Sequence, residues 1–215
     1  MVVAIDGPSG VGKSTVARAV AAALGVPHLD TGAYYRAATL VARRAGIHPG
    51  DEAGIVGALG SATIDFGPDS GLLLDGEPVA EALRGPEVTA AVSEVSAHPA
   101  VRRTVVEMQR EWVRRHGGDA VVEGRDIGTV VFPDAAVKVY LTADVAVRAA
   151  RRAADPEASG ASIPELIAQM ERRDGLDSSR ATSPLRPADD AVVIDTSHLT
   201  VAAVVGSVLD LVGRA

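Results

Sequence analysis

The chain has 215 residues, 47% of them hydrophobic, and a formal net charge of −7. This length and composition suit one globular domain and exclude wholesale disorder, while the negative charge argues against a general nucleic-acid surface. There are no cysteines, which excludes disulfides and thiolate metal sites. Without a membrane-length apolar run or a leader pattern, we expect a cytoplasmic protein that binds neither nucleic acid nor membrane.

The N-terminal part alternates strand and helix patterns. The β-branched run at 2–6 predicts a buried strand, and the alanine-rich stretch 13–24, ended by Gly25, predicts a helix. A brief strand at 26–30 and a helix at 32–45 follow. Such alternation is typical of a parallel sheet covered by helices.

The middle of the chain departs from this alternation. Residues 62–80 contain two short β-like runs separated by Gly-Pro and Asp-Gly, which predicts a small inserted meander. Helices are expected at 86–97 and 99–116, and a further buried strand at 120–124.

The C-terminal part resumes the alternation. Ser162 and Glu165 have the spacing of a capping box at the start of a helix. The other elements expected here are a strand at 137–141, a helix at 144–154, a strand at 191–195 and a closing helix at 199–215. Five short apolar strands separated mainly by helices predict an α/β fold, with a five-stranded parallel sheet and helices on both faces.

The stretch "GPSGVGKS" fits the GxxxxGK[ST] pattern between a predicted strand and a predicted helix. Its glycines allow backbone N–H groups to surround a phosphate, and the following helix adds its positive N-terminus. Lys13 is expected to reach the β- and γ-phosphates, and the Ser14 hydroxyl to ligate Mg²⁺. The residues expected to bind the nucleotide are Gly7, Gly10, Gly12, Lys13, Ser14 and Thr15. The donor is therefore expected to be ATP or GTP.

The rest of the chain favours a small kinase. It lacks the guanine-reading NKxD motif of a GTPase, and it is short for a motor. Glu123 ends the strand at 120–124, where it either orients a Mg²⁺-bound water or is an ordinary strand-end carboxylate.

Arginines in three separate segments, 30–36, 123–128 and 172–180, are expected to converge on one crevice. Arginine suits bidentate phosphate contacts, so the acceptor is expected to be a phosphate held in line with the donor. Two alternatives stay open. A small-metabolite kinase would use Asp30 as the base for a hydroxyl acceptor, and a nucleotide-binding regulator would not turn over.

Several motifs occur along the chain in a fixed order: "IDGPSGVGKST", "LDTGAYYR", "EGRDIGTVVFPDA" and "ERRDGLDSSRA", followed by "PL" and "DTS". In these motifs and in their order, the whole chain resembles the bacterial cytidylate kinases. The resemblance implies a nucleoside-monophosphate-kinase fold that transfers the γ-phosphate of ATP to CMP or dCMP with Mg²⁺, and a monomer is expected. The implied parts are a core of 1–30, 117–147 and 188–215, an NMP-binding region of 31–116 with a β-rich insert at 62–80, and a lid of 148–187.

The resemblance also implies the site residues. The acceptor phosphate would be surrounded by Tyr35, Arg36, Arg125 and Arg180. The sugar would meet Thr31 and Asp177, with Arg173 nearby, and the cytosine would be read by Ser93, Arg102 and Asp126. The residues expected to be catalytic are Lys13, Arg125, Asp126 and Arg180. The family more often has serine at Thr31 and aspartate at Glu123, so the hydroxyl and the charge are kept.

The expected cytosine contacts agree with the chemistry of the base. Cytosine has an amino donor at N4 and acceptors at N3 and O2, so a carboxylate such as Asp126 suits N4 and Arg102 suits the acceptors. Asp126 has alternative roles in an ion pair with Arg125 or as a helix cap, and Ser93 can simply face solvent.

Three lid arginines, Arg148, Arg151 and Arg152, have the i, i+3, i+4 spacing that places them on one helix face. We expect them to fold over the triphosphate when residues 155–161 hinge, with Arg152 binding the nucleotide. The alternative is a solvated basic face.

Overall fold

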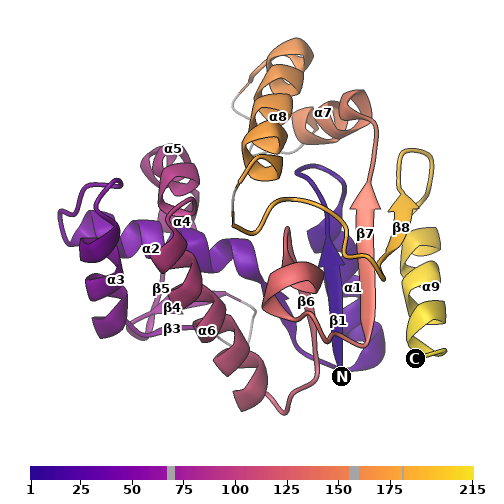
Figure 1. The fold of residues 1–215 in the computed structure, drawn as a ribbon. Helices are drawn as coiled ribbons and strands as arrows, with labels where there is room; N and C mark the ends of the chain where they lie inside the picture. Colours follow the sequence, from indigo (N-terminus) through magenta and orange to yellow (C-terminus); the bar gives the residue numbers. More distant parts are fainter. Residues whose placement is uncertain (67–70, 155–159, 181) are drawn as a thin grey trace. The chain divides into compact units, whose positions relative to one another are not determined.

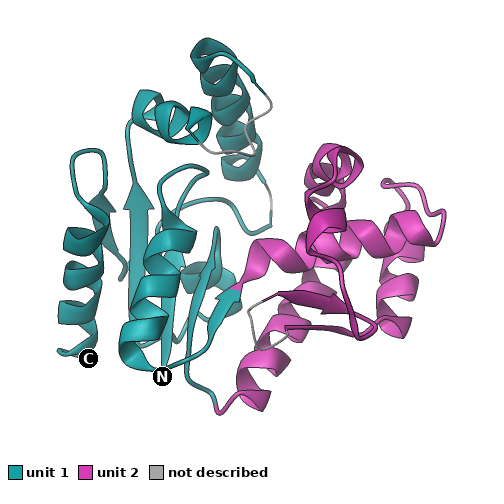
Figure 2. Ribbon diagram, turned by 180° about the vertical axis from the view of Figure 1, so that it is seen from behind, with its two compact units in different colours: residues 1–29, 118–215 teal, residues 30–117 magenta. Residues whose placement is uncertain are grey.

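The structure is a computed structural model that describes residues 1–66, 71–154, 160–180 and 182–215 (Figure 1). The chain forms two compact units (Figure 2). Unit 1 combines Met1–Leu29 with Gly118–Ala215, and unit 2 is the continuous segment Asp30–Gly117. Unit 2 is therefore an insertion into the chain of unit 1.

The main sheet is parallel and has β1 at its centre. Its strands are β1 (Val2–Asp6), β2 (His28–Asp30), β6 (Ala120–Gly124), β7 (Val137–Thr142) and β8 (Val192–Asp195). The strand order is β2-β6-β1-β7-β8, and β1 pairs in parallel with β6 on one side and with β7 on the other. The five-stranded parallel sheet predicted from the sequence is confirmed.

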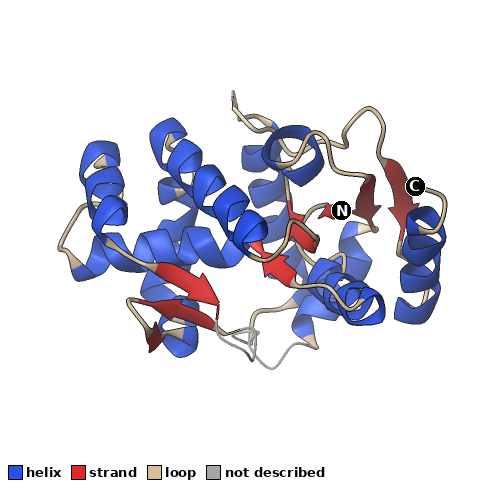
Figure 3. Ribbon diagram, turned by 90° about the horizontal axis from the view of Figure 1, so that it is seen from below, coloured by secondary structure: helices blue, strands red, loops and turns tan. Residues whose placement is uncertain are grey.

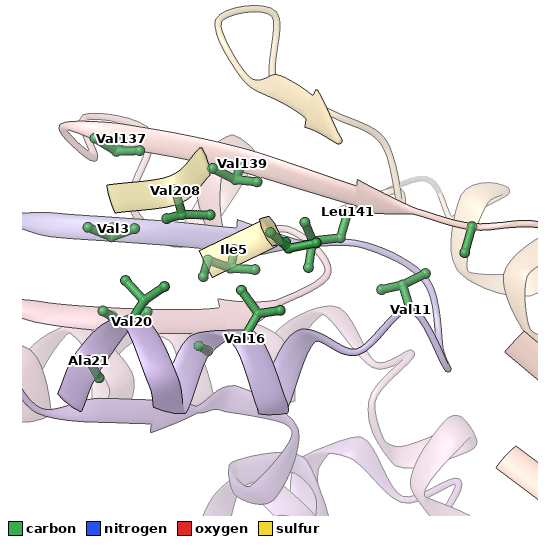
Figure 4. Packing of buried hydrophobic residues seen from close by; sticks show 14 residues of the cluster. Val3, Ile5, Val11, Val16, Val20, Ala21, Val137, Val139, Leu141 and Val208 are labelled. Atoms are coloured by element: carbon green, nitrogen blue, oxygen red, sulfur yellow. The ribbon is translucent and has the colours of Figure 1, made fainter. Parts of the chain in front are cut away.

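One face of this sheet is covered by α1 (Lys13–Leu24) and α9 (Val201–Val212), which also contact each other. The apolar side chains between sheet and helices are shown in Figure 4, and those at its centre are Val3, Ile5, Val16, Val20, Val139, Leu141 and Val208. Burying each such side chain contributes roughly 1.5–3 kcal/mol. Because successive strand residues point to opposite faces, Asp6 lies on the face opposite Ile5. There it meets η1 (Ile127–Val131), a π-helical turn that the sequence did not predict.

Unit 1 also contains a pair of helices, α7 (Val145–Ala153) and α8 (Ile163–Ser178). They pack through Ala149, Leu166 and Met170. The predicted capping box is confirmed, because the Ser162 amide donates to Glu165 Oε2 over 2.8 Å. Of the predicted hinge at 155–161, residues 155–159 lie outside the described part of the chain.

Unit 2 contains helices and a small antiparallel sheet (Figure 3). Its helices are α2 (Thr31–Arg44), α3 (Glu52–Ser61), α4 (Ala80–Arg84), α5 (Pro86–Val95) and α6 (Pro99–Arg115). Its strands are β3 (Ile64–Phe66), β4 (Leu72–Leu74) and β5 (Glu77–Pro78). The predicted meander is thus confirmed, with a third short strand. In the part of the chain that is described, no helix combines the length and the apolar character needed to cross a membrane.

Helix α3 was not predicted because Gly54, Gly57 and Gly60 weaken its helical pattern. The helix forms because the Asp51 side chain caps it, accepting from the Gly54 amide over 2.9 Å. Its apolar residues Ile55 and Leu59 are fully buried. Tertiary packing therefore overrides a low local propensity.

The core of unit 1 can be tested by shortening Leu141, which has no exposed surface. Leu141→Ala should lower the free energy of unfolding by about 2–5 kcal/mol, because a cavity replaces packed methyl groups. Urea unfolding followed by circular dichroism measures this loss. Leu199→Ala, at a side chain that is 43% exposed, is the control and should change stability by less than about 0.5 kcal/mol. Equal losses in the two variants would contradict the packing described.

Candidate active site

The phosphate loop connects β1 to α1 and passes close to the end of β7. A Cβ on Gly7 would lie 2.2 Å from the Leu141 carbonyl oxygen, so only glycine fits there. Gly12 caps α1 with a φ of 92°, a left-handed conformation that glycine adopts without strain. The loop therefore leads directly to a helix N-terminus, where backbone N–H groups and the helix dipole favour an anion.

Two polar side chains at the start of α1 contact other parts of unit 1. Lys13 Nζ donates to the Pro8 carbonyl oxygen over 2.7 Å, which holds the ammonium group against the loop. The Ser14 hydroxyl donates to Glu123 Oε2 over 2.8 Å. Lys13, the Ser14 hydroxyl and the strand-end carboxylate of Glu123 thus lie around one loop.

His28 is a residue of this cluster that the sequence analysis missed. Its Nε2 lies 2.9 Å from Glu123 Oε1, and the Glu123 side chain is only 3% exposed. Glu123 is therefore held by Ser14 on one oxygen and by His28 on the other. The sequence offered one indication of this role, which is the place of His28 in the chain. It begins a strand of the main sheet, and in this kind of sheet the strand ends carry the site.

The hydroxyl of Ser14 and the carboxylate of Glu123 are the hard oxygen ligands that Mg²⁺ prefers. Among the described residues, no three His, Asp or Glu side chains form a metal-binding cluster. A Mg²⁺ ion that accompanies a nucleotide takes one or two protein oxygens besides phosphate oxygens, and Ser14 and Glu123 have the oxygens to supply them.

The second loop of the site follows β6 and carries Arg125 and Asp126. The Arg125 guanidinium pairs with Asp177, and its Nη1 lies 4.0 Å from Asp174 Oδ1. Burial, and next the nearby Arg173, lower the pKa of Arg125, while Asp177 and Asp174 oppose the shift. Asp126 is 4% exposed, and its side chain does not cap η1, which removes the helix-cap alternative.

Asp6 joins these two loops. It is the last residue of β1, and its carboxylate accepts from the Ile127 amide on Oδ1 and the Gly128 amide on Oδ2, each over 2.8 Å. Burial raises the pKa of Asp6 to about 6, and Asp126 adds to the rise. The two amide bonds and the charge of Lys13 oppose it. At neutral pH the carboxylate is therefore ionised although it is buried.

Two basic residues of α7, Arg148 and Arg151, contact other parts of unit 1. Arg148 is 7% exposed, and its Nη1 contacts the Ser9 carbonyl oxygen at 3.1 Å and Asp174 Oδ2 at 2.6 Å. Arg151 Nη2 donates to the Thr196 carbonyl oxygen over 2.6 Å. The alternative of a solvated face is therefore wrong for Arg148, while Arg152 is exposed.

The C-terminal end of α8 brings together two of the predicted substrate residues. Arg180 Nη2 lies 2.5 Å from Asp177 Oδ1, and Asp177 is 3% exposed. Asp177 thus contacts both Arg125 and Arg180. Arg173, on the same helix, is exposed.

Unit 2 holds the remaining predicted residues. The Arg102 guanidinium lies 5.1 Å from the centre of the Tyr35 ring, so these two are brought together. Arg36 Nη1 donates to the Leu83 carbonyl oxygen over 3.2 Å. Thr31 is buried at the start of α2, whereas Ser93 is exposed on α5 and is not among these contacts.

Asp30, the base of the rival small-metabolite mechanism, has a structural role. Its Oδ1 accepts from the Gly32 amide over 2.9 Å and caps α2. The carboxylate is therefore explained without a catalytic function.

Comparisons with known proteins agree with this geometry. The family model described as "Cytidylate kinase" matches residues 3–214. A cytidylate kinase of Rhodococcus jostii (strain RHA1) is 52% identical over 222 residues, covering 100% of this chain and 95% of the relative. One of Mycobacterium leprae (strain Br4923) is 49% identical, covering 99% and 95%. A shikimate kinase structure from Bacteroides thetaiotaomicron has a TM-score of 0.50 at 15% identity, covering 99% of this chain and 98% of that one, and shows the shared fold.

The raised pKa of Asp6 predicts a pH-dependent stability. Between the unfolded value of 3.8 and the folded value of about 6, the folded chain holds a proton that the unfolded chain has lost. Raising the pH through this window therefore weakens the folded state by up to about 3 kcal/mol. Asp6→Asn removes this titration. Urea unfolding between about pH 4 and about pH 7 should show wild type losing stability relative to the variant, whereas a pH-independent difference would contradict the shift.

Proposed function

The chain belongs to the cytidylate kinase family, and we propose that it transfers the γ-phosphoryl group of ATP to CMP and dCMP, forming ADP with CDP or dCDP. The observation that carries the proposal is the adjacency of two strand ends in unit 1. Asp6, directly before the phosphate loop, is in register with Gly124, directly before Arg125. A donor loop and an acceptor loop thus leave neighbouring strands at the same edge of the sheet.

The donor side is built from the phosphate loop. Backbone N–H groups of the loop and of the α1 N-terminus bind the phosphates of ATP, and Lys13 exchanges the Pro8 carbonyl for phosphate oxygens. Ser14, supported by Glu123, would hold Mg²⁺. When bound, Mg²⁺ neutralises the charge that develops on the β- and γ-phosphates.

On the acceptor side, Arg125 and Arg180 bind the CMP phosphate and hold it in line with the γ-phosphorus. An oxygen of the CMP phosphate forms the new P–O bond while the bond to the β-phosphate oxygen breaks. Because the attacking oxygen is already anionic, no strong base is needed. Catalysis is then mainly positioning and neutralisation of charge, which suits a site crowded with guanidinium groups.

Unit 2 supplies the remaining substrate contacts in this proposal. Within unit 2, Tyr35 and Arg36 are assigned to the acceptor phosphate and Thr31 to the sugar. Within unit 1, Asp177 and Arg173 are assigned to the sugar. Asp126 accepts from the cytosine N4 amino group, and Ser93 and Arg102 read the other polar atoms of the base. The Arg102 guanidinium lies over the Tyr35 ring, which supports the placement of these two substrate-binding residues close together within unit 2.

In this proposal, residues 31–116 bind the nucleoside monophosphate and residues 148–187 form a lid. Arg152, exposed on α7, is the lid arginine expected to reach the ATP phosphates. The active unit is expected to be a monomer acting on small nucleotides.

The reaction is tested by a coupled assay of ADP formation with ATP and Mg²⁺ against CMP, dCMP, UMP, AMP, GMP, dTMP and shikimate. Turnover should be confined largely to CMP and dCMP, because the acceptor site is lined by arginines and a cytosine-reading carboxylate. Turnover of shikimate without any monophosphate would overturn the proposal and make Asp30 the base. Acceptor-independent nucleotide binding without turnover would favour a regulator.

The role of Asp126 is tested by Asp126→Ala. Loss of a charged hydrogen bond to N4 should lower kcat/KM for CMP by about tenfold to a hundredfold and shrink the preference for CMP over UMP. The measurement is kcat/KM for both nucleotides. Asp134→Ala removes an exposed carboxylate of the same segment and should leave both values unchanged. An Asp126→Ala enzyme with its full preference would exclude this account of base selection.

A further inference from the structure

The carboxylate of Asp6 occupies a position that none of the binding roles above explains. It is 4% exposed and lies between the residue that opens the phosphate loop, Gly7, and the turn that follows Arg125 and Asp126. Each oxygen accepts one backbone amide of that turn, from Ile127 and from Gly128. Asp6 therefore links the donor loop to the acceptor loop without being placed to touch either substrate.

We infer that Asp6 is a positioning residue, which fixes Arg125 and Asp126 relative to the phosphate loop so that donor and acceptor are aligned for transfer. The inference rests on the proposed function and deepens it, because it names what sets the geometry of the same site. Misplacement of reacting groups by about 1 Å can cost about a hundredfold in rate.

A carboxylate is the side chain that suits this position. Two successive N–H groups point toward the same place, and an ionised carboxylate has two oxygens that only accept. An asparagine would satisfy one amide and turn its own NH₂ donor toward the other. The substitution Asp6→Asn therefore keeps the size of the side chain while removing one of the two bonds.

The turn is packed tightly against Asp6. A Cβ on Gly128 would lie 3.2 Å from Lys138 Cδ and 3.5 Å from Asp6 Oδ2, so backbone and carboxylate are in close approach. The turn itself is π-helical, a rare geometry that is frequently found at functional sites. Asp6 therefore contacts the turn directly, through two hydrogen bonds and its close approach to Gly128.

The surroundings of Asp6 show that its charge is kept at the expense of stability. Burial disfavours the ionised form and raises its pKa to about 6. The charged or titratable groups that act on it are Asp126, which adds to the rise, and Lys13, which opposes it, and Tyr140 interacts with it from β7. A neutral side chain would avoid this penalty, and a carboxylate buried at this cost beside Arg125 and Asp126 is consistent with a role in the site.

The test compares Asp6→Asn with wild type at about pH 7.5, where Asp6 is ionised. We expect kcat with ATP and CMP to fall by about tenfold to a hundredfold, because the acceptor turn shifts. KM for ATP should change by less than about threefold, since the phosphate loop retains its own contacts. Hydrogen exchange should become faster at Ile127 and Gly128, while the amides that join β1 to β7 keep their protection.

A matched control is Asp51→Asn, the same substitution at another carboxylate that accepts a backbone amide, here that of Gly54. Asparagine caps helices as well as aspartate, so kcat and exchange should equal those of wild type. A second measurement needs no variant. In NMR spectra of the wild-type chain without nucleotide, the amide shifts of Ile127 and Gly128 should titrate together with a midpoint at about pH 6.

Several outcomes would overturn the inference. The first is that the Asp6→Asn enzyme has the kcat of wild type. The second is that the Asp6→Asn chain does not fold, or that its amide hydrogens exchange faster throughout the sheet. The third is that the amide shifts of Ile127 and Gly128 do not change with pH. The first removes the role in the reaction, and the second makes Asp6 a residue of the fold alone. A wild-type chain inactive on CMP overturns the proposed function instead, and the exchange and titration measurements still decide whether Asp6 holds the turn.

Discussion

The site depends on one steric constraint, the crossing of the phosphate loop over the end of β7. With no room for a Cβ beside the Leu141 carbonyl, Gly7 allows the chain to leave the central strand and turn at once toward α1. Helix α1 then covers the Ile5 face of the sheet, while Asp6 remains on the opposite face and meets η1. Gly7 is thus the point at which the chain passes from the central strand toward the helix that covers the Ile5 face.

The ionised side chains of the site lie near the same edge of the sheet. Carboxylates contact the cationic or hydroxyl groups proposed to bind phosphate or Mg²⁺: Glu123 contacts Ser14, and Asp177 contacts Arg125 and Arg180. These contacts keep buried charges paired in the protein alone. In the proposed function, nucleotide binding would replace these protein oxygens with phosphate oxygens around cationic groups that are already largely removed from water.

The sequence was sufficient for features that are local or periodic. The β-branched run at 2–6, the GxxxxGK[ST] motif and the capping box of Ser162 each carry their own signal, and each forms the expected element. Helix α3 was missed because its glycines hide a helix that depends on burial of Ile55 and Leu59. The roles of His28 and Asp6 were missed for another reason, since their partners Glu123, Ile127 and Gly128 lie roughly a hundred residues away.

The insertion of unit 2 has a consequence for the order of events during synthesis. The central strand β1 is translated before Asp30–Gly117, whereas both of its neighbours, β6 and β7, are translated after that segment. Unit 2 is continuous and can gather its contacts while the rest of unit 1 is still being translated. The phosphate loop is therefore translated before unit 2 but gains the neighbouring strands β6 and β7 only after it.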